Sequence, residues 1–111
     1  GSYPSGHTAI GWLWALVLAQ AVPERTDALL ARGRSYGESR LVCNVHWNSD
    51  ILQGRLRGSG TFARLQSDPV YQADMAAAKV ELAAARAPGS ASGRDCTAEA
   101  AALAQALPGA L

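Results

Sequence analysis

The chain has 111 residues, of which 49% are hydrophobic, and its formal net charge is +1. This length suits one domain with a modest core, and the near-neutral charge excludes a general electrostatic attraction to nucleic acid or to an anionic membrane. The abundant alanine favours helix, because alanine loses the least free energy on entering one. An apolar run from Ile10 to Val22 is too short to span a bilayer. Two cysteines, Cys43 and Cys96, allow one disulfide without requiring it.

The first predicted helix begins near Ser5–His7 and ends at about Ala21. A proline and a serine supply its start signals, and Pro23 prevents it from continuing. Apolar residues recur along it at helical spacing: Ile10, Leu13, Trp14, Val17, Leu18 and Ala21. Trp12 and Leu16 widen this apolar face, so we expect the helix to be buried on most sides.

A second helix is predicted to open at Pro23 and Glu24, with proline in the first turn and an acid where the helix dipole favours one. Gly33 and Gly37 weaken it, and if the helix continues through them we expect close packing against another backbone. Four apolar residues near its end are expected to lie in the core and to carry Arg40 inwards: Leu41, Val42, Cys43 and Val45. For the cysteine this predicts a buried free thiol.

A third helix is predicted over Asp50–Leu65, with Asn48 or Ser49 as its cap, because short polar side chains accept hydrogen bonds from first-turn N–H groups. Three glycines in it suggest tight contacts or a kink: Gly54, Gly58 and Gly60. Strand alternation, internal repeats and coiled-coil heptads are not visible in the sequence, so the predicted fold class is all-α.

A fourth helix, Val70 to about Arg86, is rich in alanine and is expected on the surface. The residues after it have the Pro, Gly and Ser content of a flexible linker. Residues 97–107 are predicted to form a short helix capped by Thr97. The predicted organisation is therefore a functional domain over residues 1–86 and a tail over residues 87–111.

The block Ser39-Arg-x5-His-x3-Asp contains residues whose side chains can take part in a chemical reaction. His46 and Asp50 are four positions apart, so on a helix or its first turn they lie on one face. A carboxylate that keeps one ring nitrogen protonated leaves the other nitrogen free to act as a nucleophile. Arg40 offers a planar fork for two phosphate oxygens.

The block Pro-Ser-Gly-His at residues 4–7 suits an anion. Ser5 and Gly6 precede a helix and offer a hydroxyl and unobstructed backbone N–H groups. His7 then lies beside the anion as a candidate acid. The two blocks together fit metal-free hydrolysis of a phosphate monoester, which needs oxygen-binding donors, an in-line nucleophile and an acid for the leaving group.

Simpler interpretations of these residues remain open. A His-x3-Asp pair is common on solvated helices, and Pro-Ser-Gly-His is often only a helix start. Imidazole and carboxylate also suit zinc, which would make His7, His46 and Asp50 metal ligands, although Arg40 would lie unfavourably beside a cation. The residues alone therefore make a phosphate site plausible without excluding the alternatives.

Residues 1–8 resemble the signature of bacterial class A non-specific acid phosphatases, in the wider superfamily of type-2 phosphatidic acid phosphatases and vanadium haloperoxidases. The superfamily motif Ser-Arg-x5-His-x3-Asp falls on Ser39–Asp50 with its spacing unbroken, and the resemblance extends to about Arg86. It implies an all-α helical bundle, of which this chain resembles the C-terminal helices. It also implies a secreted, periplasmic enzyme without a cofactor, which hydrolyses organic phosphate monoesters and has phosphate or vanadate as an inhibitor.

The resemblance also implies a role for each site residue. His46 attacks phosphorus and becomes a phosphohistidine, with Asp50 orienting its ring. His7 protonates the leaving alcohol and later helps to activate the hydrolytic water. The phosphoryl oxygens are bound by Arg40, Ser5 and Gly6.

One superfamily motif, Lys-x6-Arg-Pro, does not occur in the 111 residues, and the single lysine, Lys79, lies elsewhere. We therefore expect an N-terminal companion chain of the same protein to supply it. A core built for more helices would leave the face of Trp12 and Trp14 exposed, which invites a partner, and a homodimer is also compatible with the sequence.

Two other functions fit the same residues. A vanadate-dependent haloperoxidase shares the motifs because vanadate mimics phosphate, although the Gly-Ser-Tyr start argues against it. A non-catalytic helical fragment would only bind phosphate or a partner chain.

Overall fold

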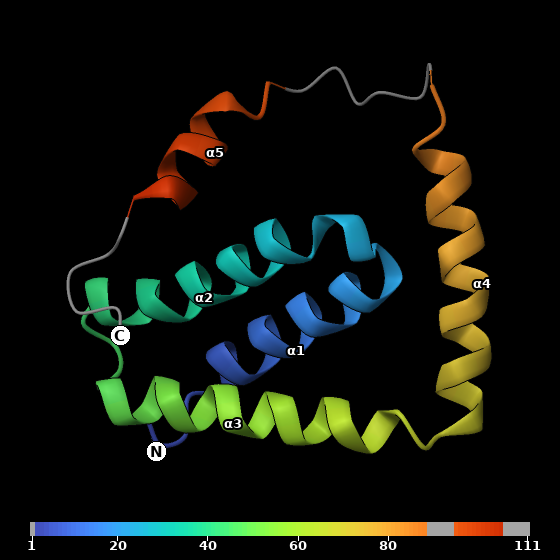
Figure 1. Ribbon diagram of the computed structural model, residues 1–111. Coiled ribbons are helices and arrows are strands. Elements are labelled where there is room, and N and C mark those ends of the chain that lie inside the picture. The colour runs from blue at the N-terminus through green and yellow to red at the C-terminus, as the bar shows by residue number, and fades with distance from the viewer. Residues whose placement is uncertain (1, 89–94, 106–111) are drawn as a thin grey trace.

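The computed structural model describes residues 2–88 and 95–105, and all regular structure in these residues is helical (Figure 1). The elements in chain order are α1 (Gly6–Ala21), the 3-10 helix η1 (Pro23–Arg25), α2 (Thr26–Val42), α3 (Asn48–Leu65), α4 (Pro69–Ala85) and α5 (Thr97–Ala104). The predicted all-α fold is confirmed. Within the described ranges, no helix combines the length and the apolar character needed to cross a membrane.

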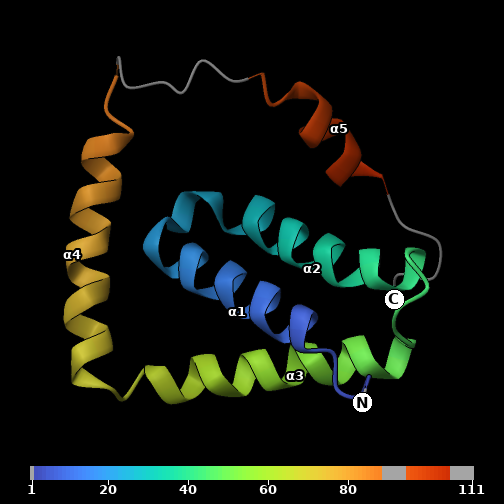
Figure 2. The ribbon, with the colours of Figure 1, turned by 180° about the vertical axis from the view of Figure 1, so that it is seen from behind.

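The central helix of the arrangement is α1, which packs along both α2 and α3. The chain reverses at η1, so α2 runs back beside α1, and α4 lies across one end of these three helices (Figures 1 and 2). The start of α1, the end of α2 and the start of α3 lie at the opposite end. This topology brings together the two sequence blocks that carry the candidate site residues.

Glycine allows α1 to approach its neighbours closely. A Cβ atom on Gly54 would lie 2.7 Å from the backbone oxygen of Ser5, and one on Gly58 would lie 2.7 Å from the backbone oxygen of Ala9. A Cβ atom on Gly33 would lie 2.5 Å from a side chain of α1.

Both α2 and α3 continue unbroken through these glycines. The predicted tight contacts are confirmed at Gly54 and Gly58, whereas the prediction for Gly60 is wrong, because an added Cβ atom there would meet nothing within 4 Å. At Gly33 the closest neighbour is a side chain rather than the predicted backbone.

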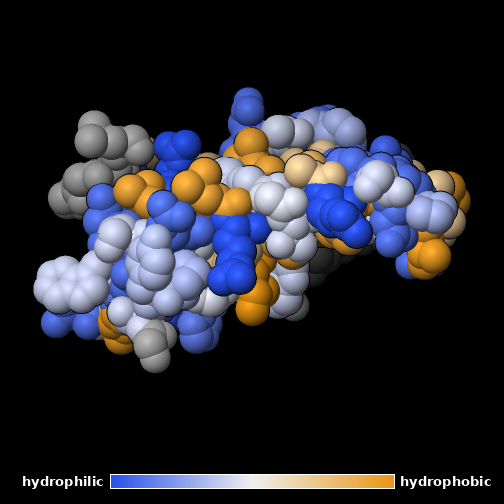
Figure 3. Space-filling model, turned by 90° about the horizontal axis from the view of Figure 1, so that it is seen from below, coloured by the Kyte–Doolittle hydropathy of each residue, from blue (hydrophilic) through white to orange (hydrophobic). Residues whose placement is uncertain are grey.

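Few large side chains are buried in the described part of the chain. The buried hydrophobic residues are Ala15, Ala21, Ile51 and Met75. The radius of gyration is 15.5 Å, whereas a compact domain of this length has about 13 Å. Hydrophobic residues reach the surface among hydrophilic ones on the face seen from below (Figure 3). Trp14 is 66% exposed, as expected for the tryptophan face, while Trp12 is half-buried.

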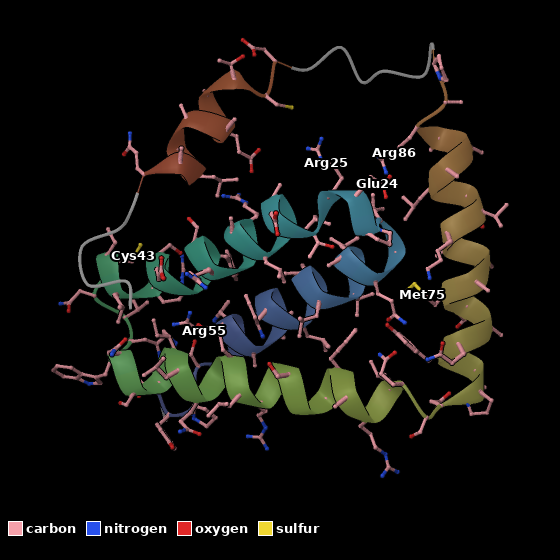
Figure 4. All side chains as sticks on the ribbon, in the orientation of Figure 1. Glu24, Arg25, Cys43, Arg55, Met75 and Arg86 are labelled. Atoms are coloured by element: carbon pink, nitrogen blue, oxygen red, sulfur yellow. The ribbon has the colours of Figure 1, made fainter. Side chains whose placement is uncertain are left out.

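Three contacts hold α4 against the end of the helix layer. Met75 projects from α4 toward the other helices (Figure 4) and is buried there. The hydroxyl of Tyr71 donates to Oε1 of Gln20 at 2.6 Å. Arg86 forms an ion pair with Glu24 of η1. Most other residues of α4 are exposed, in agreement with the predicted surface helix.

The predicted core around the end of α2 is wrong. Val42 is 73% exposed and Val45 is 55% exposed, Cys43 is exposed, and Leu41 is only half-buried. The chain reverses directly after α2, and the described elements do not pack over this reversal. Apolar character alone therefore did not predict burial here.

Three helix starts also differ from the predictions. Pro23 opens a 3-10 turn rather than the helix itself, which begins at Thr26. The N-cap of α3 is Trp47, not Asn48 or Ser49, and the carboxylate of Asp50 in the first turn accepts a hydrogen bond from the backbone N–H of this N-cap residue.

The short C-terminal helix has Cys96 rather than Thr97 at its N-cap. The carboxylate of Asp95 accepts a hydrogen bond from the Thr97 N–H at 2.9 Å, so the aspartate side chain takes the predicted role of the threonine. The helix ends at Ala104, and residues 106 and 107 of the predicted range lie outside the described residues.

Candidate functional site

The turn between α2 and α3 has a defined hydrogen-bond pattern. The N–H of Val45 donates to the carbonyl of Arg40 at 3.1 Å, and the N–H of Asn44 donates to the carbonyl of Leu41 at 2.8 Å. Asn44 has a φ of 55°, in the left-handed region. These features define a Schellman helix ending, with Asn44 at its left-handed position. The ending ties the residue before His46 to the backbone of Arg40, which gives the x5 spacing of the motif a structural reason.

His46 and Asp50 form a bonded pair at the start of α3. Nδ1 of His46 lies 3.2 Å from Oδ2 of Asp50, and their side chains are only 13% and 3% exposed. The backbone N–H of Trp47 also donates to Oδ2, at 3.0 Å. This N–H and, after it, His46 hold the pKa of Asp50 below its ordinary value, although burial acts in the opposite direction.

The ionised carboxylate of Asp50 sets the tautomer of His46. A carboxylate can only accept hydrogen bonds, so Nδ1 of His46 carries the proton that lies between the two groups. Nε2 of the neutral ring then keeps its lone pair. When the ring is neutral, the pair presents an oriented imidazole whose Nε2 is unprotonated, as a nucleophilic role requires.

A backbone hydrogen bond joins the two sequence blocks. The N–H of Ser5 donates to the backbone carbonyl of Asp50 at 3.0 Å, which fixes the start of α1 against the first turn of α3. Ser5 is fully buried, and its Oγ accepts hydrogen bonds from the N–H of Thr8 at 3.2 Å and from the Thr8 hydroxyl at 2.9 Å. Ser5 is thus the N-cap of α1.

The first turn of α1 offers a surface that an anion can approach. Gly6 and His7 are exposed, and a Cβ atom on Gly6 would have no neighbour within 4 Å. Backbone N–H groups at a helix start have no partner within the helix, and the helix dipole favours negative charge there. Open space in front of Gly6 is therefore suited to a phosphate-sized anion.

Arg40 lies beside Tyr36, a residue that also lines a groove with His7. Nε and Nη2 of Arg40 donate to Oγ of Ser39 at 3.2 and 3.0 Å, and its guanidinium lies 5.4 Å from the centre of the Tyr36 ring. His7 and Tyr36 both line a groove between α1 and α2. The tyrosine therefore supports the guanidinium of Arg40 and lines the same groove as His7.

The structure thus brings some of the predicted residues into direct contact and leaves others apart. Ser5, His46 and Asp50 form one bonded cluster, whereas Arg40 is bonded to its neighbour Ser39. His7 is related to this cluster by its position in the first turn of α1, two residues after Ser5. Among residues 2–88 and 95–105, no three His, Cys, Asp or Glu side chains are grouped so as to hold a metal ion.

Sequence reasoning missed three supporting residues. Thr8 holds the Ser5 side chain, Asn44 forms the left-handed helix ending, and Tyr36 stacks under Arg40. Two of these left a signal: asparagine tolerates left-handed backbone better than most residues, and an aromatic residue four positions before an arginine lies on the same helix face. The contact of Thr8 with Ser5 depends on burial and left no signal in the sequence.

Comparison with known proteins matches residues 1–67, which include all of α1, α2 and α3, to the PAP2 superfamily. The chain belongs to this superfamily, and the resemblance found in its motifs is confirmed. Among its relatives is the non-specific acid phosphatase of Salmonella typhimurium, with 52% identity over 82 residues, covering 74% of this chain and 33% of the relative.

Two further relatives are similar to the same degree. The non-specific acid phosphatase of Providencia stuartii is 51% identical over 83 residues, which cover 75% of this chain and 34% of the relative. The acid phosphatase of Zymomonas mobilis is 48% identical over 86 residues, which cover 78% of this chain and 33% of the relative. The chain spans about a third of the length of these relatives.

Proposed function

We propose that this chain carries the catalytic centre of an acid phosphatase, which hydrolyses organic phosphate monoesters through a phosphohistidine and without a metal ion. The observation that carries the proposal is the bonded cluster of Ser5, Asp50 and His46, in which a buried carboxylate orients the imidazole. The relatives, which are all acid phosphatases, support the same reaction.

In the first half of the proposed reaction, Nε2 of His46 attacks phosphorus and the bond from phosphorus to the ester oxygen breaks. His7 donates a proton to the departing alkoxide, which leaves as the alcohol. In the second half, His7 takes a proton from a water molecule, and that water attacks the phosphohistidine. The phosphorus–nitrogen bond breaks and releases inorganic phosphate, and Asp50 stabilises the ring throughout.

The phosphoryl oxygens need donors that are in place before the reaction begins. In the proposal Arg40 turns its guanidinium fork toward two of these oxygens, starting from its position over Tyr36. Gly6 contributes its N–H at the open start of α1, and Ser5 contributes its side-chain hydroxyl.

The proposal includes two parts that rest on the motif resemblance. A segment with the Lys-x6-Arg-Pro motif, on an N-terminal companion chain, would add a lysine and an arginine to the phosphate. The periplasm would be the place of action, with residues 1–86 as the functional domain.

The test is hydrolysis of p-nitrophenyl phosphate at acid pH in excess chelator, with the Lys-x6-Arg-Pro segment supplied. We expect chelator-resistant turnover, and we expect His46→Ala to abolish both turnover and the phosphorylated protein trapped by a rapid quench. Asn48→Ala, which changes an exposed residue nearby, should keep both. Full activity in His46→Ala would exclude the proposed mechanism.

A further inference from the structure

The hydroxyl group of Ser39 uses its full hydrogen-bonding capacity within α2. Nε and Nη2 of Arg40 donate to its Oγ at 3.2 and 3.0 Å, and the hydroxyl itself donates to the backbone carbonyl of Tyr36 at 2.6 Å. A serine hydroxyl has one hydrogen to donate and two lone pairs that accept, so these three bonds leave nothing for a ligand. Ser39 therefore ties the guanidinium of Arg40 to the backbone of the helix.

The ring of Tyr36 supports the same guanidinium group. The centre of the ring lies 5.4 Å from the guanidinium carbon of Arg40, within the range of a cation–π interaction. The two residues are four positions apart on α2, so they lie on one face of the helix. Tyr36 thus contributes twice, because its carbonyl anchors Ser39 and its ring contacts the cation.

The ring of Tyr36 is held in turn by α1. A Cβ atom on Gly11 would lie 2.3 Å from Cδ1 and 2.9 Å from Cε1 of the ring, so only glycine leaves room for the ring in this position. Tyr36 is 38% exposed, and most of its surface is therefore covered. The ring connects the backbone of α1 to the guanidinium on α2.

These contacts decide which hydrogen-bond donors of Arg40 remain. A guanidinium group has five N–H donors, one on Nε and two each on Nη1 and Nη2. The donor on Nε and one of those on Nη2 point to Ser39, which leaves both donors of Nη1 and one of Nη2. Two of the three remaining donors lie side by side at the end of the side chain. They form a second fork that can bind two oxygens of one phosphoryl group.

We propose that Tyr36 and Ser39 are positioning residues, which hold Arg40 so that it binds the phosphoryl group through the fork between Nη1 and Nη2. A guanidinium that is fixed before the substrate arrives loses less conformational entropy on binding and needs no reorganisation during the reaction. The role of Arg40 toward phosphate rests on the proposed function, whereas the contacts that hold it do not depend on the chemistry of His46.

The kinetic test measures turnover of p-nitrophenyl phosphate, with the Lys-x6-Arg-Pro segment supplied, and the Ki of inorganic phosphate. Tyr36→Phe keeps the ring and should retain wild-type values, whereas Tyr36→Leu should lower kcat/KM and raise Ki, each about 3- to 30-fold. Gly11→Ala should act like Tyr36→Leu, because the added methyl group displaces the ring. Gly60→Ala, whose methyl group meets no neighbour, is the control and should change neither quantity.

A double-mutant cycle with Arg40 separates positioning from a general loss of structure. A chain with Arg40→Gln has no cation left to hold, so adding Tyr36→Leu should lower kcat/KM no further. An equal loss in both backgrounds would overturn the proposal, because Tyr36 would then act by another route. Wild-type kinetics in Tyr36→Leu would overturn it as well.

Nuclear magnetic resonance of the 111-residue chain tests the contacts of Arg40 without turnover. Its Nε–H group donates to Ser39, so the proton should exchange slowly with water and give a resolved signal. Tyr36→Leu and Ser39→Ala should lose this signal, while Tyr36→Phe should keep it. A signal that survives in both Tyr36→Leu and Ser39→Ala would overturn the proposal.

The same spectra separate the two forks and the two proposals. Inorganic phosphate, added to the chain together with the Lys-x6-Arg-Pro segment, should shift the Nη signals of Arg40 and leave its Nε signal in place. A shift of the Nε signal alone would assign phosphate to the other fork and overturn the proposal. Loss of the Nε signal in Tyr36→Leu and Ser39→Ala, in a protein whose wild type does not hydrolyse the ester, would contradict the proposed function and still support the positioning of Arg40.

Discussion

At the scale of single residues, Asp50 joins the two halves of the candidate site. Its carboxylate accepts hydrogen bonds from His46 and from the backbone of Trp47, while its backbone carbonyl accepts one from Ser5. The side chain therefore orients the imidazole, and the main chain positions the start of α1. A substitution of the side chain separates these contributions, because the bond to Ser5 survives it.

Asp50→Asn should lower kcat on the order of 10⁴-fold, by analogy with the orienting aspartate of serine proteases. The carboxamide can donate to Nδ1 of His46, which favours the tautomer with the proton on Nε2 and so blocks the nucleophile. The measurement is the turnover of p-nitrophenyl phosphate by folded protein. A variant with near-wild-type kcat would show that His46 does not need the carboxylate.

The same variant gives a pH signature. The folded pKa of Asp50 lies below its ordinary value of 3.8, so its charge stabilises the folded state above that value. This contribution is lost as the pH falls through the lowered pKa of the folded state. Urea unfolding from neutral pH down to pH of about 3 should therefore show a steeper loss of stability in the wild type than in Asp50→Asn. Parallel losses would contradict this contribution.

Gly6→Ala tests the open space at the start of α1. The added methyl group meets no neighbour, so the free energy of unfolding should stay the same or rise by up to about 1 kcal/mol. It would project where the proposed phosphate lies, so kcat/KM should fall at least about tenfold, equivalent to about 1.4 kcal/mol.

Gly60→Ala is the matched control for this prediction. Gly60 also has no neighbour within 4 Å of an added Cβ atom, but it lies near the far end of α3. It should raise stability similarly and leave kcat/KM unchanged. A fall in activity in both variants would show that the effect at Gly6 is not local.

At the scale of elements, the ending of α2 determines how Arg40 and His46 are related. The Schellman hydrogen bonds require left-handed backbone at Asn44, and its φ of 55° meets that requirement. Glycine adopts this conformation without steric cost, whereas a β-branched residue does so poorly.

Asn44→Gly should keep the fold and the activity, whereas Asn44→Val should lower the free energy of unfolding by about 1–2 kcal/mol. The valine variant should also lower kcat, since a disturbed turn moves His46 relative to Arg40. Thermal unfolding and turnover of both variants measure these effects. Equal stability of the two variants would mean that the left-handed position carries no strain for valine.

At the scale of the whole molecule, the described chain is an open layer of three helices with two outlying helices. α4 is held by Met75, Tyr71 and the pair of Arg86 with Glu24, whereas α5 has few contacts. Both helices follow the family match over residues 1–67. The site lies at the end of the layer that is remote from α4.

A chain that ends after Arg86 should keep the site. It loses the exposed pair of Arg32 with Glu99, and such a pair contributes about 0–1 kcal/mol. We therefore expect a decrease of at most about 1 kcal/mol in the free energy of unfolding and an unchanged kcat. Chemical denaturation and turnover of the shortened chain test this, and a large loss of either would show that the tail belongs to the functional domain.

The sequence by itself determined the helical class and the extents of α1 and α4 to within a residue or two, and it predicts the residues of the candidate site. These depend on local signals: Pro4 and Ser5 before a helix, Pro23 after it, and the four-residue spacing of His46 and Asp50. Such signals act within one or two helical turns, so they can be recognised without knowing the fold.

Only the tertiary structure decided which surfaces are buried and how the two blocks meet. The exposure of Val42 and Val45 depends on which elements cover the end of α2, and apolar character does not encode that. The bond from Ser5 to Asp50 spans 45 positions and requires glycine at the crossing of α1 and α3. Long-range contacts depend on how helices pack in space, and a local pattern contains no information about that packing.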